Sequence, residues 1–304
     1  MQNQDYILGS IYGLLVGDAL AYPYKNLKNI KEYDIIMTKN NHEDITGSWT
    51  SSGSFSLAIM ESIIENDGIN LEYILDKFLD VYIAGQYSPD EECKDTSPIT
   101  SESLQNYTNG LPFDKCGITK TTFDNDCLLR MLPVGLYLAN SNIENVVDQA
   151  HKVCSITHNN VYSKVCCAVF CLIIRNILLQ KAEKVFDLLD EHYRTKQMND
   201  YLDALNNFKK MSSTTLSNTR NINDTFWGAW SIFSSNQQNT EKALIHSIHM
   251  GGDINRRTAL VGLLSGLSNG ISDIPEKWLS NLKVSIDIKE LINNFTKIIQ
   301  RKIR

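Results

Sequence analysis

The chain has 304 residues, of which 42 % are apolar and 21 % are charged, close to the averages of ordinary globular domains. This composition excludes a disordered or fibrous protein. With 29 Lys and Arg against 35 Asp and Glu, the net charge is -6. We therefore expect neither general nucleic-acid binding nor binding to an anionic membrane surface, because both partners are negatively charged.

No targeting or membrane segment is expected from the sequence. The longest nearly unbroken apolar run, 165–174, is about half of the ~20 residues that a bilayer span requires. The first ten residues lack the features of a secretory signal, and an odd count of seven cysteines does not resemble a disulfide framework. These features favour a reducing, cytoplasmic location. Cys166, Cys167 and Cys171 lie inside the apolar run, where we expect buried hydrophobes rather than metal or redox sites.

Helical periodicity dominates the chain, and no long stretch alternates with period two. Apolar residues recur at three- and four-residue spacing in the segments 7–15, 55–63, 71–81 and 165–179. The polar segment 85–126 predicts a long irregular excursion with a short helix at 101–107. A second polar stretch, 211–224, precedes an aromatic helix at 226–233. We therefore predict an all-α fold in which residues 1–304 form a single domain.

Two segments near opposite ends of the chain carry glycines spaced by four. They are Gly9, Gly13 and Gly17, and Gly262, Gly266 and Gly270. Glycine inside a helix costs ~0.5 to 1 kcal/mol relative to alanine, so close packing of two helices, 7–20 and 257–267, is the expected compensation. The stripes adjoin Gly17-Asp18 and Gly251-Gly252-Asp253. We expect these polar clusters to meet at one end of the helix pair.

Five strings of the sequence stand out together. They are GSIYGLLVGDAL at 9–20, GSWTSSGSFSLAIMES at 47–62, LRMLP at 129–133, SITH at 155–158 and GGDINRRTALVG at 251–262. Their order and spacing resemble those of the ADP-ribosylglycohydrolases, which include ADP-ribosyl-arginine hydrolases and dinitrogenase reductase-activating glycohydrolases. The resemblance runs from about residue 7 to residue 285.

The resemblance implies an orthogonal helical bundle with a polar cleft for two Mg²⁺ ions and an ADP-ribose group. The family cleaves the N- or O-glycosidic bond between ribose and an acceptor, commonly the guanidinium of a modified arginine. Mg²⁺ prefers oxygen ligands, so such a site needs several carboxylates. The family supplies them in a Thr-Asp-Asp motif after Trp or Tyr and in a Gly-Gly-Asp-x-Asp-Thr motif.

The chain departs from the family at these metal-ligand positions. They correspond here to Thr50, Ser51, Ser52, Asp253 and Asn255. Ser51, Ser52 and Asn255 each stand in place of an aspartate, and Arg256 stands in place of the following threonine. Two unit charges ~4 Å apart interact by ~4 kcal/mol at an effective dielectric of ~20, so losing three negative charges and gaining a positive one weakens cation binding strongly. We expect the two Mg²⁺ ions to be absent or weakly bound.

Arg256 itself has two interpretations. It could take the place of the metals, alone or together with Arg257, by pairing with Asp253, Asp18 or a bound phosphate, because a guanidinium offers five donors in a rigid fork. It could instead fill the vacated cavity as a buried ion pair or lie solvated at the surface. The sequence leaves these alternatives open.

The resemblance also assigns a catalytic candidate and a set of ligand-binding positions. Asp95 matches the aspartate that acts near the ribose as a base or orienting group, although Asp90, Glu91 and Glu92 leave the register open. The ligand-binding positions are Asp18, Asn125, Asp126, Arg130, His158, Gly251, Gly252 and Arg256.

Several of these positions have altered surroundings. Asp124 and Asp126 replace glycines of the family, and we expect their charge to repel a pyrophosphate. Asn221 stands where the family often has an aromatic residue that packs on the nucleoside. His158 would either bind a ribose or phosphate or link two helices. Cys154 lies four residues before it, so a thiol–imidazole pair is a further alternative, although cysteine is commonplace in apolar helices.

Three functional hypotheses follow from the sequence. The first is an ADP-ribosylglycohydrolase-family protein whose hydrolysis is weak or lost. The second is a non-catalytic module that binds ADP-ribose, an ADP-ribosylated protein or another nucleotide. The third is a structural or interaction protein that keeps only the bundle. The acceptor, the partner protein and the oligomeric state are not predicted.

Overall fold

The computed structural model describes residues 2–25, 27, 30, 33–39, 45–213 and 219–303, and this part of the chain contains helices but no β-strand. The α-helices in chain order are α1 (Gln2–Ala21), α2 (Ser51–Asn66), α3 (Leu71–Ala84), α4 (Pro98–Thr108), α5 (Asp126–Leu129), α6 (Leu132–Tyr137), α7 (Ile143–Ser155), α8 (Val161–Leu178), α9 (Val185–Thr195), α10 (Asn199–Lys210), α11 (Ile222–Ser235), α12 (Thr240–His249), α13 (Ile254–Asn269), α14 (Glu276–Leu279) and α15 (Ile286–Lys302). Short 3-10 turns lie at Tyr22–Tyr24, Phe113–Lys115, Met211–Ser213 and Ile271–Asp273. The predicted all-α fold is confirmed.

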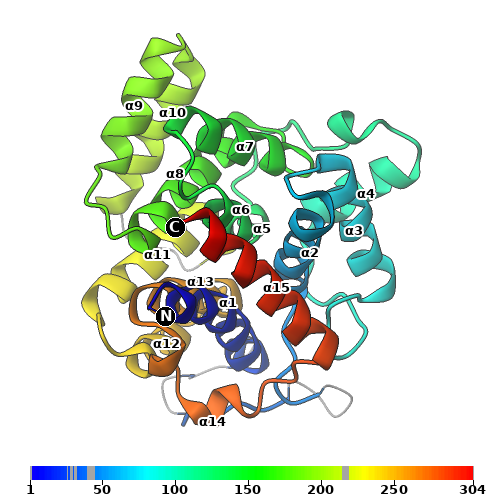
Figure 1. The fold of residues 1–304 in the computed structure, drawn as a ribbon, viewed down its shortest axis with the longest axis vertical. Coiled ribbons are helices and arrows are strands. Elements are labelled where there is room, and N and C mark those ends of the chain that lie inside the picture. Colours follow the sequence, from blue (N-terminus) through cyan, green and yellow to red (C-terminus); the bar gives the residue numbers. More distant parts are fainter. Residues whose placement is uncertain are drawn as a thin grey trace.

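The antiparallel helices α1 and α13 pack against each other, and α2, α11, α12 and α15 lie around this pair (Figure 1). A methyl group added at Gly13 would lie 2.1 Å from the carbonyl oxygen of Gly262, and one at Gly9 would lie 2.3 Å from that of Gly266. The backbones of the two helices are therefore in direct contact, as the glycine stripes predict.

Gly270 differs from the other stripe glycines. It follows the last residue of α13 with a φ of +88°, so it ends the helix instead of packing within it. A methyl group there would also lie 1.9 Å from the Asp5 carboxylate. The spacing of four therefore has a different physical cause at this position.

α8 lies in the interior of the molecule and packs against α6, α7 and α10. It is long and apolar enough to cross a bilayer by length and composition alone, with a mean hydropathy of 1.8. The helix is longer than the apolar run 165–174, because it extends that run at both ends. However, 78 % of the span is buried inside the molecule, as is typical of a core helix.

The polar segment 85–126 is more ordered than the sequence predicts. Ser97 accepts a hydrogen bond from the backbone N–H of Thr100 and Pro98 occupies the first helical turn, so α4 begins earlier than the predicted 101–107 helix. The aromatic helix predicted at 226–233 is the centre of α11, which Asn221 caps. Part of the second polar stretch, 214–218, lies outside the described residues.

Backbone contact between α1 and α13 makes a prediction about stability. Gly13→Ala should lower the free energy of unfolding by at least about 1 to 3 kcal/mol, because the added methyl group forces two helix backbones apart. The measurement is chemical denaturation at pH 7. Gly68→Ala is the matched control, since its methyl group would approach Asn66 only to an ordinary 3.7 Å. Equal stability of the two variants would contradict the packing.

Candidate active site

The polar ends of α1 and α13 meet next to the start of α2. Asp18, fully buried near the end of α1, accepts hydrogen bonds from the backbone nitrogen of Thr50 at 3.0 Å and from its hydroxyl at 2.9 Å. Burial raises the pKa of Asp18 to about 6, even though the Thr50 hydrogen bonds favour the carboxylate. Thr50 is in turn the N-cap of α2, so its hydroxyl links the two helix ends.

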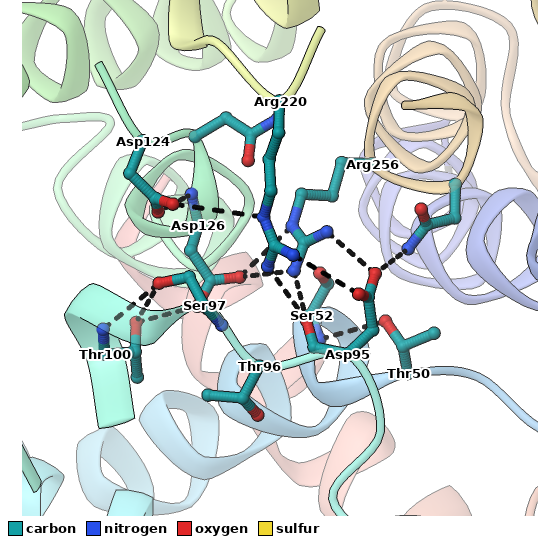
Figure 2. Close-up of polar contacts among 12 residues, drawn as sticks. Thr50, Ser52, Asp95, Thr96, Ser97, Thr100, Asp124, Asp126, Arg220 and Arg256 are labelled. Carbon is teal, nitrogen blue, oxygen red and sulfur yellow. Dashed lines mark hydrogen bonds and ion pairs between the residues drawn. The ribbon is translucent and has the colours of Figure 1, made fainter. Parts of the chain in front are cut away.

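Arg256 lies at the centre of a group of carboxylates (Figure 2). It is fully buried in the first turn of α13, and its Nη1 is 2.8 Å from Asp95 Oδ2 and 3.6 Å from Asp253 Oδ1. Its Nη2 is 3.0 Å from Asp126 Oδ1, and Nη2 also donates to the main-chain oxygen of Asp95. We name Arg256, Asp95, Asp126 and Asp253 the Arg256 cluster. The structure shows Arg256 buried and ion-paired, with Asp253 rather than Asp18 among its partners, so a solvated surface arginine is excluded, whereas both interpretations include a pair of this kind.

Asp95 pairs with several basic side chains at once. Besides Arg256, it accepts hydrogen bonds from Lys25, from Arg220 at 3.4 Å and from the side-chain nitrogen of Asn255 at 2.9 Å. Although burial alone would raise it, the charges of Arg256 and Lys25 hold the pKa of Asp95 below its usual value. Asp95 is therefore a carboxylate at neutral pH with little tendency to take up a proton.

The structure resolves the register of the acidic run in favour of Asp95 as the residue in the cluster. Asp90 points elsewhere, accepting a hydrogen bond from the backbone of Ile45 and pairing with Lys94. Asp95 itself has a φ of +60°, a strained value for a residue with a side chain. Its three charged partners hold this conformation in place.

Asp126 is buried between two arginines. Arg130 Nη2 lies 3.0 Å from Asp126 Oδ2, and the Thr100 hydroxyl donates to the same oxygen at 2.7 Å. Although burial opposes ionisation, Arg256 and Arg130 lower the pKa of Asp126. The Arg130 guanidinium also lies over the adjacent rings of Phe55 and Phe78, whose centres are 4.9 and 5.0 Å away. Both predicted ligand-binding residues thus have internal partners.

His158 is fully buried and links the end of α7 to the segment before α5. Its Nε2 is 3.0 Å from Asp124 Oδ1, and its Nδ1 is 2.9 Å from the Thr157 hydroxyl. The Cys154 thiol donates to the main-chain oxygen of His158 at 3.3 Å instead of to the imidazole. The alternative of a thiol–imidazole pair is therefore wrong, because Asp124 and Thr157 occupy both ring nitrogens.

Asn125 and the glycine turn before α13 complete the site. Asn125 Nδ2 donates to Thr225 at 2.6 Å and to Asp253 Oδ2 at 2.7 Å. Gly251 and Gly252 have φ values of +70° and +76°, which explains why glycine stands there. Arg257 donates to the main-chain oxygens of Ser247 and Gly251, so it fixes this turn.

The positions that align with the family's metal ligands offer a poor donor set for two divalent cations. Among the described residues, the buried hydroxyls of Ser51 and Ser52 and the Oδ1 atom of Asn255 have no hydrogen-bond partner, so neutral oxygens remain available. The carboxylates of the Arg256 cluster, however, are already paired with basic side chains. Mg²⁺ needs an octahedral shell of oxygens that is rich in carboxylate, which these residues do not provide.

Comparison with known proteins identifies the ancestry of this site. The family model described as ADP-ribosylglycohydrolase matches residues 1–303. This chain belongs to the ADP-ribosylglycohydrolase family. The resemblance recognised in the sequence is thereby confirmed, and it covers nearly the whole chain.

Individual relatives are distant. The chain is 22 % identical to the ADP-ribosylarginine hydrolase Tri1 of Pseudomonas putida, covering 95 % of this chain and 77 % of that protein. It is also 22 % identical to the ADP-ribosyl-[dinitrogen reductase] glycohydrolase of Rhodospirillum rubrum, covering 93 % and 92 %. A solved ADP-ribosylglycohydrolase-related protein complex superposes with a TM-score of 0.78 at 21 % identity over 98 % of this chain and 99 % of that one, which supports the fold.

Two site residues were missed by the sequence analysis. Lys25 follows the 3-10 turn Tyr22–Tyr24 after α1, and Arg220 lies just before α11 in a polar stretch with no periodicity. A bridge between Asp124 and Asn221 brings that stretch to the site, which places Arg220 beside Asp95. The only available signal was an isolated cation next to a helix end, which is a common surface feature and does not by itself indicate a site.

Removing Arg256 should take away the cation that Asp95, Asp126 and Asp253 share, although Lys25 and Arg220 still pair with Asp95 and Arg130 still pairs with Asp126. Arg256→Met is expected to lose about 3 to 5 kcal/mol of unfolding free energy at pH 7. In the wild type, the pKa values of Asp95 and Asp126 in the folded protein are depressed. Their ion pairs therefore stabilise the fold above ~pH 4, and this stabilisation is lost as the pH falls through the pKa values of the folded protein. In the variant these pKa values rise, so its deficit should shrink between pH 7 and about pH 4.5.

The measurement is urea denaturation of both proteins at the two pH values. Arg194→Met is the matched control, because Arg194 forms an exposed ion pair with Asp190 on α9 and its loss should matter little at either pH. A deficit of Arg256→Met that stays constant with pH would contradict the assigned pairing.

Proposed function

We propose that this chain recognises the ADP-ribosyl group of a modified protein without a magnesium pair, and that it hydrolyses the glycosidic bond slowly or not at all. The observation that carries the proposal is the fully buried Arg256 guanidinium, which is paired with Asp95, Asp126 and Asp253 beside the family's metal-ligand positions. The Arg256 guanidinium thus places a single positive charge in the region where the family's motifs supply carboxylates for two divalent ions.

The charges around the Arg256 cluster nearly balance without a metal. Five aspartates, Asp18, Asp95, Asp124, Asp126 and Asp253, face four basic side chains, Lys25, Arg130, Arg220 and Arg256. Burial also favours the protonated form of Asp18. Adding two Mg²⁺ ions to such a set would bring four further positive charges next to Arg256, which supports a site without them.

Asp95 is poorly suited to activate water. A general base works best when its pKa lies near the operating pH, and the partners of Asp95 lower its pKa instead. The same partners fix its orientation, so it can still accept a hydrogen bond from a ribose hydroxyl. The chain's own residues thus favour holding a substrate over cleaving it.

Recognition of a diphosphate is supported by the basic side chains at the rim of the cluster. Lys25 and Arg220 are 23 % and 32 % exposed, whereas Arg256 and Arg130 are buried. Guanidinium and ammonium groups bind phosphate oxygens through charge-assisted hydrogen bonds. The repulsion predicted from Asp124 and Asp126 is reduced, because His158, Arg130 and Arg256 bind those carboxylates.

The proposal also suits a reducing, cytoplasmic setting and a protein partner. All seven cysteines are free, and six of them are buried. The family acts on ADP-ribosylated substrates, and one relative carries the name ADP-ribosylarginine hydrolase. We therefore take an ADP-ribosylated protein, modified on arginine, as the first substrate to test.

Calorimetric titration with ADP-ribose tests the proposal. We expect the same affinity in millimolar Mg²⁺ and in a chelator, because the chain's own side chains hold the ligand. Lys25→Ala combined with Arg220→Ala should weaken binding about tenfold or more. Lys152→Ala is the control, since Lys152 forms an exposed pair with Asp148 on α7.

Three results of these assays would contradict the proposed function. Affinity that requires Mg²⁺, or release of ADP-ribose from modified arginine at about 1 per second or faster, would restore a conventional hydrolase. An absence of binding under both conditions would favour the structural or interaction protein.

Rebuilding the family motif should restore metal binding. The variant Ser51→Asp, Ser52→Asp, Asn255→Asp, Arg256→Thr removes the buried cation and supplies three new carboxylates. We expect millimolar Mg²⁺ to raise its melting temperature by several degrees and to leave the wild type nearly unchanged, since a ligand stabilises only the state that it binds. A variant that folds only when Mg²⁺ is present would show the same stabilisation of the folded state by the bound ion.

The matched control separates charge from size. Ser51→Asn, Ser52→Asn, Arg256→Thr makes similar changes in volume, keeps Asn255 and adds no carboxylate, so Mg²⁺ should not stabilise it. A rise in the melting temperature of the wild type with Mg²⁺ but not with Ca²⁺ would contradict the proposal.

A further inference from the structure

Three cysteines from three different helices converge beneath the candidate active site. They are Cys127 of α5, Cys154 of α7 and Cys167 of α8, and their sulfur atoms all lie within 4.8 Å of one another. Each side chain is fully buried. The next residue before Cys127 is Asp126 of the Arg256 cluster, so this thiol cluster lies directly behind the site but shares no side chain with it.

The geometry of the thiol cluster is close to that of a thiolate-bound ion. With metal–sulfur bonds of ~2.3 Å, three sulfurs around a central ion stand ~4 Å apart. The sulfurs of Cys127, Cys154 and Cys167 therefore need to approach by less than ~1 Å, which side-chain rotation can supply without moving a helix. Because the three cysteines lie on three packed helices, α5, α7 and α8, the triangular arrangement of their sulfur atoms is fixed by the fold.

The cluster lacks a fourth ligand among the described residues. The nearby imidazole of His158 is committed to Asp124 and Thr157 through its two nitrogens. Structural zinc is almost always four-coordinate and tetrahedral, whereas thiolates also select the softer Cu(I) ion. We propose that Cys127, Cys154 and Cys167 form a three-coordinate site for Cu(I).

The surroundings favour negative charge on Cys154 alone, because the hydrogen bond to Cys154 raises the pKa of Cys127 and burial raises the pKa of Cys167. Burial raises the pKa of a thiol, but hydrogen bonds from Cys127 and Cys167, together with the charges of Lys164 and Arg130, outweigh it and lower the pKa of Cys154. The pKa of Lys164 is itself lowered, mainly by burial. His158 also faces the cluster through its charge interaction with Cys127. These basic groups partly balance the excess negative charge of a Cu(I)–trithiolate.

Binding is a ligand exchange with a simple proton balance. Cu(I) forms one bond to each sulfur, and every thiol that becomes a ligand releases its proton to solvent. No electron is transferred. The thiol hydrogen bonds from Cys154 to the His158 carbonyl and from Cys167 to the Cys127 carbonyl are given up in the process.

The test uses the whole reduced chain without oxygen. Cu(I) is titrated in competition with bicinchoninate, both into the native protein and during refolding from urea, because the cluster is buried. We expect one ion per chain, with the ultraviolet charge-transfer absorption of copper–thiolate bonds. Cys154→Ala and Cys167→Ala should each weaken binding by at least about a hundredfold.

Cys171→Ala is the matched control. Cys171 lies one turn after Cys167 on the same helix, is equally buried and donates its thiol to the Met131 carbonyl at 3.8 Å. It should leave Cu(I) affinity unchanged at a similar cost in stability. Equal affinity for all three variants, or no uptake even during refolding, would overturn the site. So would formation of a disulfide within the cluster in place of copper binding.

Discussion

A guanidinium removed from water must be matched by negative charge, and this requirement holds the candidate site together. Arg256 is anchored on α13, Asp95 comes from the segment before α4, and Asp126 begins α5. Three segments that are distant in sequence are thereby joined at one buried charge. Because breaking a buried ion pair costs far more than removing both of its partners, none of these residues can be replaced alone without a penalty. The constraint explains the strained φ of Asp95 and the dense partners of Asp126.

The same interaction limits the chemistry that the site can perform. A guanidinium directs its hydrogen bonds in a fixed plane, whereas a metal ion orients ligands in three dimensions and lowers the pKa of bound water. Arg256 can therefore hold carboxylates and, through them, order a ligand, but it cannot generate hydroxide. The exposed ends of Lys25 and Arg220 remain as the groups able to meet a phosphate. Binding without rapid hydrolysis is the activity that these properties favour.

The sequence predicted those features that depend on spacing along one helix. The contact between Gly13 and Gly262 followed from the cost of glycine in a helix, and the meeting of Asp18 with the start of α13 followed from that contact. Features made by loops were not predictable. The cap at Ser97 lengthens α4, and a bridge at Asn221 carries Arg220 to Asp95, but neither leaves a periodic signal. Cys127, Cys154 and Cys167 likewise converge only because three helices pack in three dimensions.

The substitutions at the metal-ligand positions form a consistent set when they are considered as charges. Aspartates at 51, 52 and 255 beside Asp18, Asp95 and Asp253 would repel one another unless cations lay between them. Neutral side chains at those positions remove this repulsion, and Arg256 then balances the carboxylates that remain. Arg256 placed among the full set of aspartates and two Mg²⁺ ions would instead suffer like-charge repulsion. The arginine and the neutral residues therefore depend on each other, and returning a single aspartate would not recreate a magnesium site while Arg256 occupies its centre.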